Sequence, residues 1–162
     1  MRVIEVAGSR RSRVVVGERI ESVGRYLPRG KRLVLVTDGN VEAAHRERFP
    51  SAPVLRIGTG EGAKTLGTVG ELYERLLALE ADRSTFLLGV GGGVVCDVAG
   101  FVASTFLRGI PFGFVATTLL AQVDASVGGK NGVNLEGYKN IVGTFNQPEF
   151  VLCDLEMLAT LP

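Results

Sequence analysis

The stretch over residues 86–106 restricts the possible folds of this chain more than any other segment. It is almost entirely apolar and approaches the length of a membrane-spanning helix. Asp97 lies near its middle, however, and would cost about 2.5–3.5 kcal/mol in a bilayer. Several glycines between positions 89 and 93 also interrupt a continuous helix. We therefore expect a buried strand over 85–90, a glycine turn over 91–93 and a buried helix over 94–106, and we disfavour a membrane span.

The rest of the chain alternates between strand patterns and helix patterns. Apolar and β-branched runs predict strands over 3–6, 13–16, 31–37, 53–57, 110–116 and 150–153. Helical spacing predicts helices over 19–27, 41–49 and 65–79, with shorter helical segments after Thr118 and over 154–161. Residues 126–134 are predicted to form a glycine-rich β-hairpin. This order predicts an α/β fold, with a Rossmann-like, mostly parallel sheet flanked by helices in one domain over 1–162.

Charge and cysteine content narrow the functional classes. A net charge of +1 gives no reason to expect nucleic acid or an acidic membrane as the main partner. The arginine cluster at 10–13 follows a predicted Gly8–Ser9 turn, and a solvated loop explains it more simply than a binding patch. Cys96 and Cys153 lie in apolar sequence without metal-site spacing, so we expect two buried, reduced thiols. With no signal-peptide pattern at the N-terminus, a cytoplasmic protein is expected.

Polar groups follow several predicted strands at their carboxyl ends. The glycine turn over 91–93 joins backbone N–H groups to a helix N-terminus, which suits the pyrophosphate of a dinucleotide, although a tight structural turn is equally compatible. The GxGxxG pattern of an ordinary dinucleotide fingerprint is absent from the first strand. Because parallel strands end at one edge of a sheet, these groups are predicted to converge on one site. The polar residues concerned are Asp38, Asn40, Glu61, Lys64, Thr117 and Thr118, for which N-caps, turns and a solvated Glu61–Lys64 pair are the alternatives.

Residues 122–140 carry a dense set of polar side chains in glycine-rich sequence. Lysines and amides in such a segment suit a substrate phosphate or carboxylate. A polar surface hairpin without a ligand is the alternative. The residues concerned are Asp124, Lys130, Asn131, Asn134, Lys139 and Asn140.

Four blocks of the sequence resemble the 3-dehydroquinate synthase family, whose enzyme acts second in the shikimate pathway. The blocks are GGGVVCDVAGFVASTFLRG (91–109), PFGFVATTLLAQVDASVGGKNGVN (111–134), YKNIVGTFNQP (138–148) and CDLEMLATLP (153–162). The sequence departs from the family's usual residues at Cys96, Ala125 and Asn131, where glycine, serine and threonine are common. None of these departures removes a charged group.

The resemblance implies a set of ligand contacts in a homodimer. Lys130 and Asn140 would contact the sugar-phosphate substrate, and Arg108 would reach the phosphate bound by the neighbouring subunit. NAD contacts are implied at Asp38, Asn40, Glu61, Lys64, Gly92, Gly93, Val94, Asp97, Thr117, Thr118, Asp124, Lys130, Lys139, Met157, Leu158, Ala159 and Thr160.

The resemblance also implies an activity for the complete enzyme. This is the NAD- and metal-dependent lyase reaction that converts 3-deoxy-D-arabino-heptulosonate 7-phosphate to 3-dehydroquinate and phosphate, in aromatic amino acid biosynthesis. The family's zinc or cobalt ion is held by a Glu and two His of a C-terminal helical domain, which is not in this sequence. The chain's one histidine, His45, is predicted to be solvated on an exposed helix, so no metal ligands and no turnover by this chain alone are expected. A related inosose or valiolone synthase, or a non-catalytic nucleotide-binding module, are the alternatives.

Overall fold

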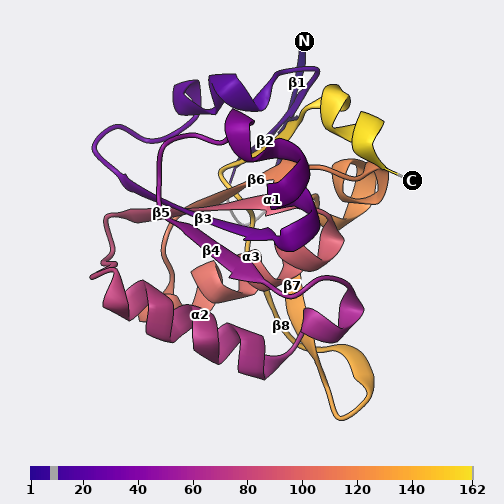
Figure 1. The fold of residues 1–162 in the computed structure, drawn as a ribbon. Coiled ribbons are helices and arrows are strands. Elements are labelled where there is room, and N and C mark those ends of the chain that lie inside the picture. Colours follow the sequence, from indigo (N-terminus) through magenta and orange to yellow (C-terminus); the bar gives the residue numbers. More distant parts are fainter. Residues whose placement is uncertain (8–10, 162) are drawn as a thin grey trace.

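A seven-stranded sheet forms the centre of the computed structural model, which describes residues 1–7 and 11–161. The predicted Gly8–Ser9 turn lies outside the described residues. Strand order is β1-β2-β9-β6-β5-β3-β4 (Figure 1). Within the described chain, β1 and β2 pair antiparallel and the other neighbours pair parallel. The strands are β1 (Arg2–Val6), β2 (Ser12–Val16), β3 (Arg32–Asp38), β4 (Val54–Ile57), β5 (Thr85–Gly91), β6 (Phe112–Ala116) and β9 (Phe150–Cys153).

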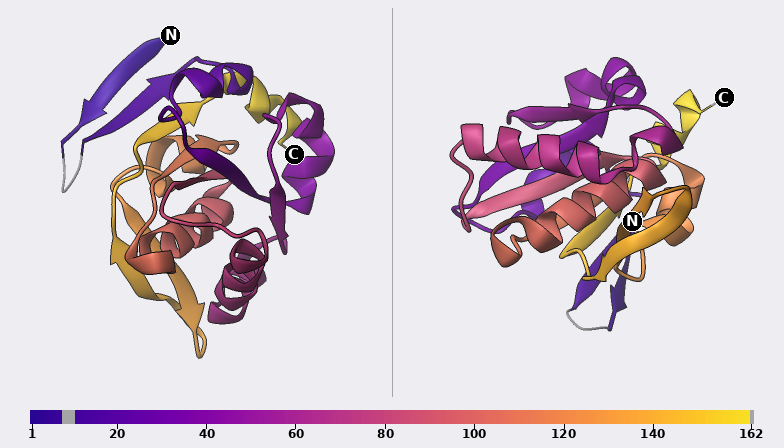
Figure 2. Two further views of the ribbon diagram at one scale, coloured as in Figure 1. Left: turned by 90° about the vertical axis from the view of Figure 1, so that its left-hand side faces the viewer. Right: turned by 90° about the horizontal axis from the view of Figure 1, so that it is seen from below.

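Helices cover both faces of this sheet, as Figure 2 shows from two sides. One face packs against α2 (Leu66–Ala78) and α3 (Gly93–Thr105), which together supply much of the larger hydrophobic cluster. The opposite face packs against α1 (Gly39–His45) and the 3-10 helices η1 (Ile20–Arg25) and η6 (Leu155–Thr160). The predicted α/β architecture with a mostly parallel sheet is confirmed.

The apolar stretch over 86–106 folds as predicted, into strand β5, a glycine turn and helix α3. Phe86 and Leu88 belong to the cluster on one face of the sheet and Leu87 to the cluster on the other, so β5 is buried on both sides. Gly89 lies under α3, where a Cβ would stand 3.1 Å from the Cβ of Ala99. In the described part of the chain, no helix has both the length and the apolar character needed to span a bilayer.

The glycine-rich hairpin is longer than predicted and lies further along the chain. It consists of β7 (Lys130–Leu135) and β8 (Tyr138–Phe145), and it packs on α3 as a separate two-stranded sheet. The turn is at Glu136 and Gly137, whose φ angles of 51° and 80° suit a tight hairpin turn. The prediction over 126–134 was wrong because two of its glycines serve close packing. A Cβ on Gly132 would lie 2.8 Å from the carbonyl oxygen of Val142 on the partner strand.

Several predicted helical segments have a tighter or wider winding than an α-helix. Segments 19–27 and 154–161 form the 3-10 helices η1 and η6, and the segment after Thr118 contains the π-helix η5 (Ala121–Ala125). Helix α1 ends at His45 and continues as the 3-10 helix η2 (Arg46–Arg48). In such short segments, apolar spacing does not distinguish i+3 from i+4 or i+5 hydrogen bonding. Two further 3-10 turns are η3 (Glu61–Ala63) and η4 (Phe106–Arg108).

Candidate nucleotide-binding site

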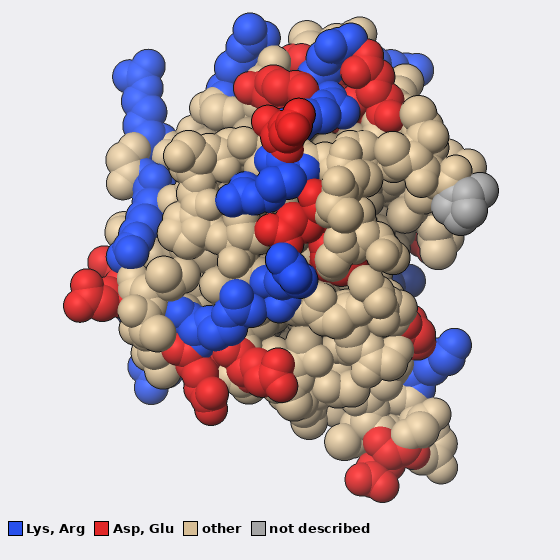
Figure 3. Space-filling model, viewed as in Figure 1, with Lys and Arg blue, Asp and Glu red and all other residues tan. Residues whose placement is uncertain are grey.

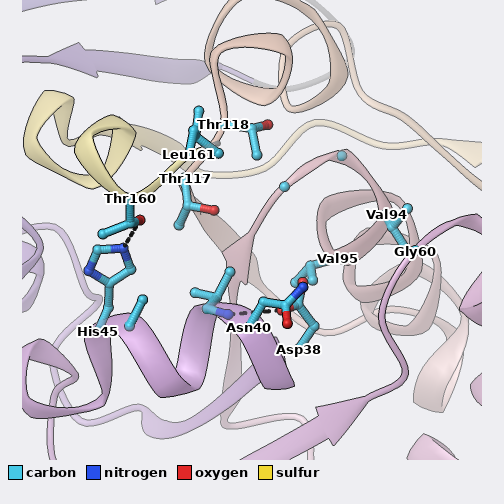
Figure 4. Close-up of a pocket in the computed structure, with 14 residues that line it drawn as sticks. Asp38, Asn40, His45, Gly60, Val94, Val95, Thr117, Thr118, Thr160 and Leu161 are labelled. Atoms are coloured by element: carbon cyan, nitrogen blue, oxygen red, sulfur yellow. Dashed lines mark hydrogen bonds between the residues drawn. The ribbon is translucent and has the colours of Figure 1, made fainter.

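The connections of β3 and β5 create a crevice at the carboxyl edge of the sheet. These strands are neighbours, but the chain leaves β3 through α1 toward β4 and leaves β5 through α3 toward β6, in the opposite direction (Figure 1). Such a switch point is where open α/β sheets bind ligands. A cavity of about 500 Å³ lies there, between α1, the first turn of α3 and η6 (Figure 4).

Side chains from several strand ends line this cavity. The residues are Asp38, Asn40, Val41, Ala44, His45, Gly60, Gly92, Gly93, Val94, Val95, Thr117, Thr118, Thr160 and Leu161. The predicted convergence of the ends of β3, β5 and β6 on one place is therefore observed, with Gly60 representing the segment after β4.

The glycine turn presents the N-terminus of α3 to the cavity. Gly92 is the N-cap and supplies no side-chain hydrogen bond, so the first N–H groups of the helix have no partner within it. A Cβ on Gly91 would lie 2.5 Å from the Cβ of Val95, and a Cβ on Gly92 would lie 3.0 Å from Cγ2 of Thr118. These close approaches explain the glycines, and the N–H groups that have no partner within the helix make this turn suited to a phosphate.

Asp38 joins β3 to α1 and is held by a capping hydrogen bond. Its Oδ1 accepts from the N–H of Val41 at 2.9 Å, so it does act as the N-cap of α1. Next to it, the hydroxyl of Thr37 donates to the carbonyl oxygen of Val90 at 2.7 Å and ties β3 to β5. Asp38 also lines the cavity, where its carboxylate is suited to accept from a ribose hydroxyl.

His45 is part of the cavity wall, so the prediction of a solvated histidine was wrong. It is only 6% exposed, and its Nε2 lies 3.0 Å from Oγ1 of Thr160 in η6 (Figure 4). The hydroxyl of Thr160 also lies 3.1 Å from the carbonyl oxygen of Met157, to which it can donate. Burial lowers the pKa of His45, and the charge of Arg48 lowers it further. No local pattern around His45 indicates this contact, because Thr160 lies 115 positions further along the chain.

Hydrogen bonds hold η6 and η5 beside the sheet. Asp154 caps η6 by accepting from the N–H of Glu156 at 3.0 Å, and its Oδ2 forms an ion pair with Arg48 at 2.6 Å. The amide of Gln122 donates to the carbonyl oxygens of Ala116 at 3.0 Å and Asp154 at 3.2 Å. These contacts fix the strand end of β6 and the helix that carries Thr160 in the cavity wall.

The two threonines after β6 serve the local backbone as well as the cavity. The N–H of Thr117 donates to the carbonyl oxygen of Gly91 at 2.9 Å, and Oγ1 of Thr118 accepts from the N–H of Ala121 at 3.2 Å. The capping interpretation of Thr118 is therefore correct. Both residues nevertheless line the cavity, so capping and ligand contact are compatible.

Lys64 and Asp97 form an ion pair beside the cavity, which contradicts the solvated Glu61–Lys64 alternative. The Lys64 side chain is 5% exposed, and its Nζ contacts Oδ2 of Asp97 in α3. Burial raises the pKa of Asp97, while Lys64 lowers it and the charges of Glu61 and Asp124 raise it. These four residues thus form one charged cluster. Glu61 directly follows Gly60 in the chain and Asp97 follows Val95 by two positions, and both Gly60 and Val95 line the cavity.

The remaining predicted contact residues lie outside the cavity lining. Lys130, Lys139 and Asn140 are exposed on the hairpin, and Asp124 is exposed at the end of η5. Arg108 is exposed beyond the far end of α3, about 20 Å from the glycine turn by helix length. The side chain of Met157 is buried in the core, while Leu158 and Ala159 lie beside it in η6.

The residues that depart from the family pattern have structural partners. Asn131 is buried, and its Nδ2 donates to the carbonyl oxygens of Gly129 at 3.0 Å and Asn146 at 2.9 Å. Ala125 would touch a Cβ placed on Gly93, at 3.2 Å. Cys96 and Cys153 are both free and buried, as predicted, and burial raises the pKa of Cys153 to about 11. Among the described residues, no three His, Cys, Asp or Glu side chains are grouped as a metal site.

Comparisons with known proteins agree on one group of relatives. A sequence profile described as 3-dehydroquinate synthase N-terminal matches residues 54–162. The chain is 46% identical over 148 residues to the 3-dehydroquinate synthase of Symbiobacterium thermophilum, which covers 86% of this chain and 41% of that protein.

Solved structures of related enzymes have the same fold. 2-Deoxy-scyllo-inosose synthase complexed with carbaglucose-6-phosphate, NAD+ and Co2+ matches with a TM-score of 0.88 and 37% identity, over 99% of this chain and 47% of that one. 2-epi-5-epi-Valiolone synthase from Streptomyces hygroscopicus subsp. jinggangensis 5008, with NAD+ and Zn2+ bound, matches with a TM-score of 0.85 and 29% identity, over 98% of this chain and 47% of that one. The chain therefore spans less than half the length of each of these relatives.

Proposed function

The chain belongs to the 3-dehydroquinate synthase N-terminal family, and we propose that it is the NAD-binding domain of a 3-dehydroquinate synthase. The observation that carries this proposal is the cavity at the switch point between β3 and β5, into which the uncapped N-terminus of α3 opens. A dinucleotide needs a site for its pyrophosphate and an acceptor for its ribose hydroxyls, and this cavity offers both.

We assign the parts of NAD to the cavity by chemistry. The pyrophosphate accepts from the N–H groups at Gly92, Gly93 and Val94, and Asp38 accepts from a ribose hydroxyl. The hydroxyls of Thr117, Thr118 and Thr160 and the amide of Asn40 supply further polar contacts. The charged cluster of Glu61, Lys64, Asp97 and Asp124 extends the site beyond Val94. Bound NAD+ supplies hydride acceptance and return.

The exposed polar residues of the hairpin are proposed to contact the substrate, 3-deoxy-D-arabino-heptulosonate 7-phosphate. Lys130 and Lys139 offer ammonium groups to its phosphate or carboxylate, and Asn140 offers an amide. We propose that Arg108, which is exposed beyond the opposite end of α3, contacts the phosphate of a substrate bound by a second copy of the chain in a homodimer. These groups orient the substrate and stabilise its charge.

We propose that a second domain completes the enzyme and covers one side of the cavity. Leu119, Leu120 and Val123 are 60%, 63% and 67% exposed beside it, and Leu155 and Leu161 are also exposed. Figure 3 shows an uncharged surface on that side, while charges of both signs are interspersed elsewhere on the face. The related 3-dehydroquinate synthase is more than twice as long as this chain, so it contains enough additional residues for such a domain. The described residues do not fit a metal ion, so no metal-dependent step is assigned to this domain.

Titration of the chain with NAD+ in a calorimeter tests the proposal directly. We expect saturable binding of NAD+ and weaker binding of NADP+, because the Asp38 carboxylate would repel a 2′-phosphate. A chain that is folded but binds neither nucleotide would contradict the proposal and also the alternative of a non-catalytic nucleotide-binding module.

A related sugar-phosphate cyclase is the second candidate, because an inosose synthase matches 99% of this chain. The higher identity to a 3-dehydroquinate synthase favours the first candidate. Assay of the full-length gene product on heptulosonate 7-phosphate and on hexose and heptulose phosphates separates the two. Turnover of the first substrate alone supports the synthase, and turnover of another sugar phosphate alone contradicts it.

A further inference from the structure

Asn134 in β7 joins two segments to which the proposed function gives different ligands. Its backbone N–H donates to the carbonyl oxygen of Lys64 at 2.9 Å, and its Nδ2 donates to Oε1 of Glu61 at 2.9 Å. Its Oδ1 accepts from the backbone N–H of Asn140 at 2.8 Å. Glu61 and Lys64 belong to the segment between β4 and α2, which lies beside the hairpin in Figure 1. One residue thus bonds to both the cofactor segment and the proposed substrate residue.

The backbone at Asn140 is in an unusual conformation that this contact explains. Its φ of 54° is left-handed, which costs about 1–2 kcal/mol for a residue with a side chain, although asparagine tolerates it best. The β7–β8 ladder also shifts register between Val133 and Leu135, opposite this position. Such bulges re-aim a side chain, and they persist only where the surroundings hold them. The Asn134 side chain provides that hold, because it accepts the N–H that leaves the ladder.

The same residue connects the hairpin to the cavity wall. Lys64, whose carbonyl oxygen accepts from Asn134, forms its ion pair with Asp97 in α3. Asp97 comes directly after the first turn of α3, and Val94 and Val95 of that turn line the cavity. A short chain of direct contacts therefore runs from the cavity through Asp97, Lys64 and Asn134 to Asn140. A polar surface hairpin without a ligand would need none of these links.

We propose that Asn134 is a positioning residue that couples occupation of the nucleotide cavity to the orientation of Asn140. This inference rests on the proposed function, which assigns NAD to the cavity and substrate to Asn140. NAD bound against the 60–64 segment and α3 stabilises the hydrogen bonds at Asn134, and these keep the Asn140 bulge in place. The substrate-binding face of the hairpin is then ordered when the cofactor is present.

Amide hydrogen exchange at the Asn140 N–H, followed by NMR with and without saturating NAD+, measures this coupling. In the unaltered chain we expect NAD+ to slow exchange at Asn140. Asn134→Leu removes the acceptor, so exchange should be about fivefold faster without NAD+ and should not respond to NAD+. Ile141→Ala, at an exposed side chain next to Asn140 in β8, is the matched control and should behave as the unaltered chain does.

A second pair of variants tests the hydrogen bond between Asn134 and Glu61 by exchanging its donor and its acceptor. Asn134→Asp keeps an acceptor for the Asn140 N–H but sets a carboxylate against Glu61, so exchange without NAD+ stays near normal and the response to NAD+ is lost. Adding Glu61→Gln supplies an amide donor to the new carboxylate, and the response should return. A merely structural role for Asn134 predicts no such rescue. If Asn134→Leu does not fold, this pair decides the matter alone.

The outcomes separate the two proposals. NAD+ that binds the unaltered chain without slowing exchange at Asn140 would refute the coupling and leave the proposed function intact. A double variant that binds NAD+ but shows no returned response would also refute it. An unaltered chain that does not bind NAD+ would overturn the proposed function and the coupling that depends on it.

Discussion

Lys64 and Asp97 contact each other as a largely buried ion pair although 33 positions separate them in the chain. The pair joins the segment after β4 to α3, beside the carboxyl edge of the sheet. Burial disfavours both charges, so each side chain depends on the other for its stability. Burial raises the pKa of Asp97, while its hydrogen bond and charge interaction with Lys64 lower it.

Removal of one partner should therefore destabilise the fold more than removal of both. Asp97→Ala leaves the Lys64 ammonium buried and should lower the free energy of unfolding by about 3 kcal/mol. The double replacement Lys64→Met with Asp97→Leu should recover most of this loss, because no unpaired charge remains. Urea unfolding at pH 7 measures both values, and equal losses in the two variants would argue against the pair.

His45 should make the stability depend on pH in the mildly acidic range. Its pKa in the folded state lies below 6.5, mainly because of burial, so the unfolded chain binds the proton more strongly. The contribution of neutral His45 to the free energy of unfolding is complete above pH 6.5 and is lost as the pH falls through the lowered pKa. His45→Gln keeps a hydrogen-bonding group for Thr160 but does not titrate. From pH 7 to pH 5, the unfolding free energy should fall more in the original chain than in this variant. Equal falls in the two proteins would be evidence against a buried neutral histidine.

The parts of the fold that could be predicted are those encoded by neighbouring residues. The strand, turn and helix over 86–106 were recognisable because apolar runs and glycines act within a few positions. The strand ends at Asp38, Gly92 and Thr117 could be assigned to one edge because parallel topology leaves no other arrangement. Local patterns thus located the cavity.

The parts that could not be predicted depend on partners far along the chain. His45 has a polar local context, and only the packing of η6 over α1 makes it a wall residue. Lys64 has Glu61 as its sequence neighbour but pairs with Asp97. The hairpin turn at Glu136 lacks an Asn or Asp signal, while the glycines at 132 and 143 serve packing between strands. Tertiary contacts decided each of these cases.

Three glycine-to-alanine variants should separate nucleotide binding from stability. At Gly92 the φ of −79° is ordinary and a Cβ would meet only the Thr118 side chain, at 3.0 Å, so the new methyl group should mainly obstruct a phosphate. Calorimetry should show NAD+ affinity reduced at least about tenfold, with stability lowered by about 1 kcal/mol or less.

The two control variants act on stability in opposite directions. A Cβ at Gly91 would lie 2.5 Å from the Cβ of Val95, so Gly91→Ala should destabilise by about 1–3 kcal/mol. Gly70 lies inside α2 with nothing within 4 Å of an added Cβ, so Gly70→Ala should stabilise by about 0.5–1 kcal/mol and leave NAD+ binding unchanged. Undiminished NAD+ affinity in Gly92→Ala would count against phosphate binding at the turn.

Lys130 should affect turnover of the full-length protein more than its affinity for NAD+. The residue begins β7, is exposed and lies outside the cavity lining, so its charge is available to the substrate phosphate. Lys130→Met should lower kcat about 100-fold, while the Kd for NAD+ changes by less than about tenfold. Lys31→Met is the matched control, because Lys31 precedes β3 at the opposite edge of the sheet and donates there to the carbonyl oxygen of Arg83. Steady-state kinetics and calorimetry on both variants measure the difference, and unchanged turnover in Lys130→Met would exclude this lysine from the reaction.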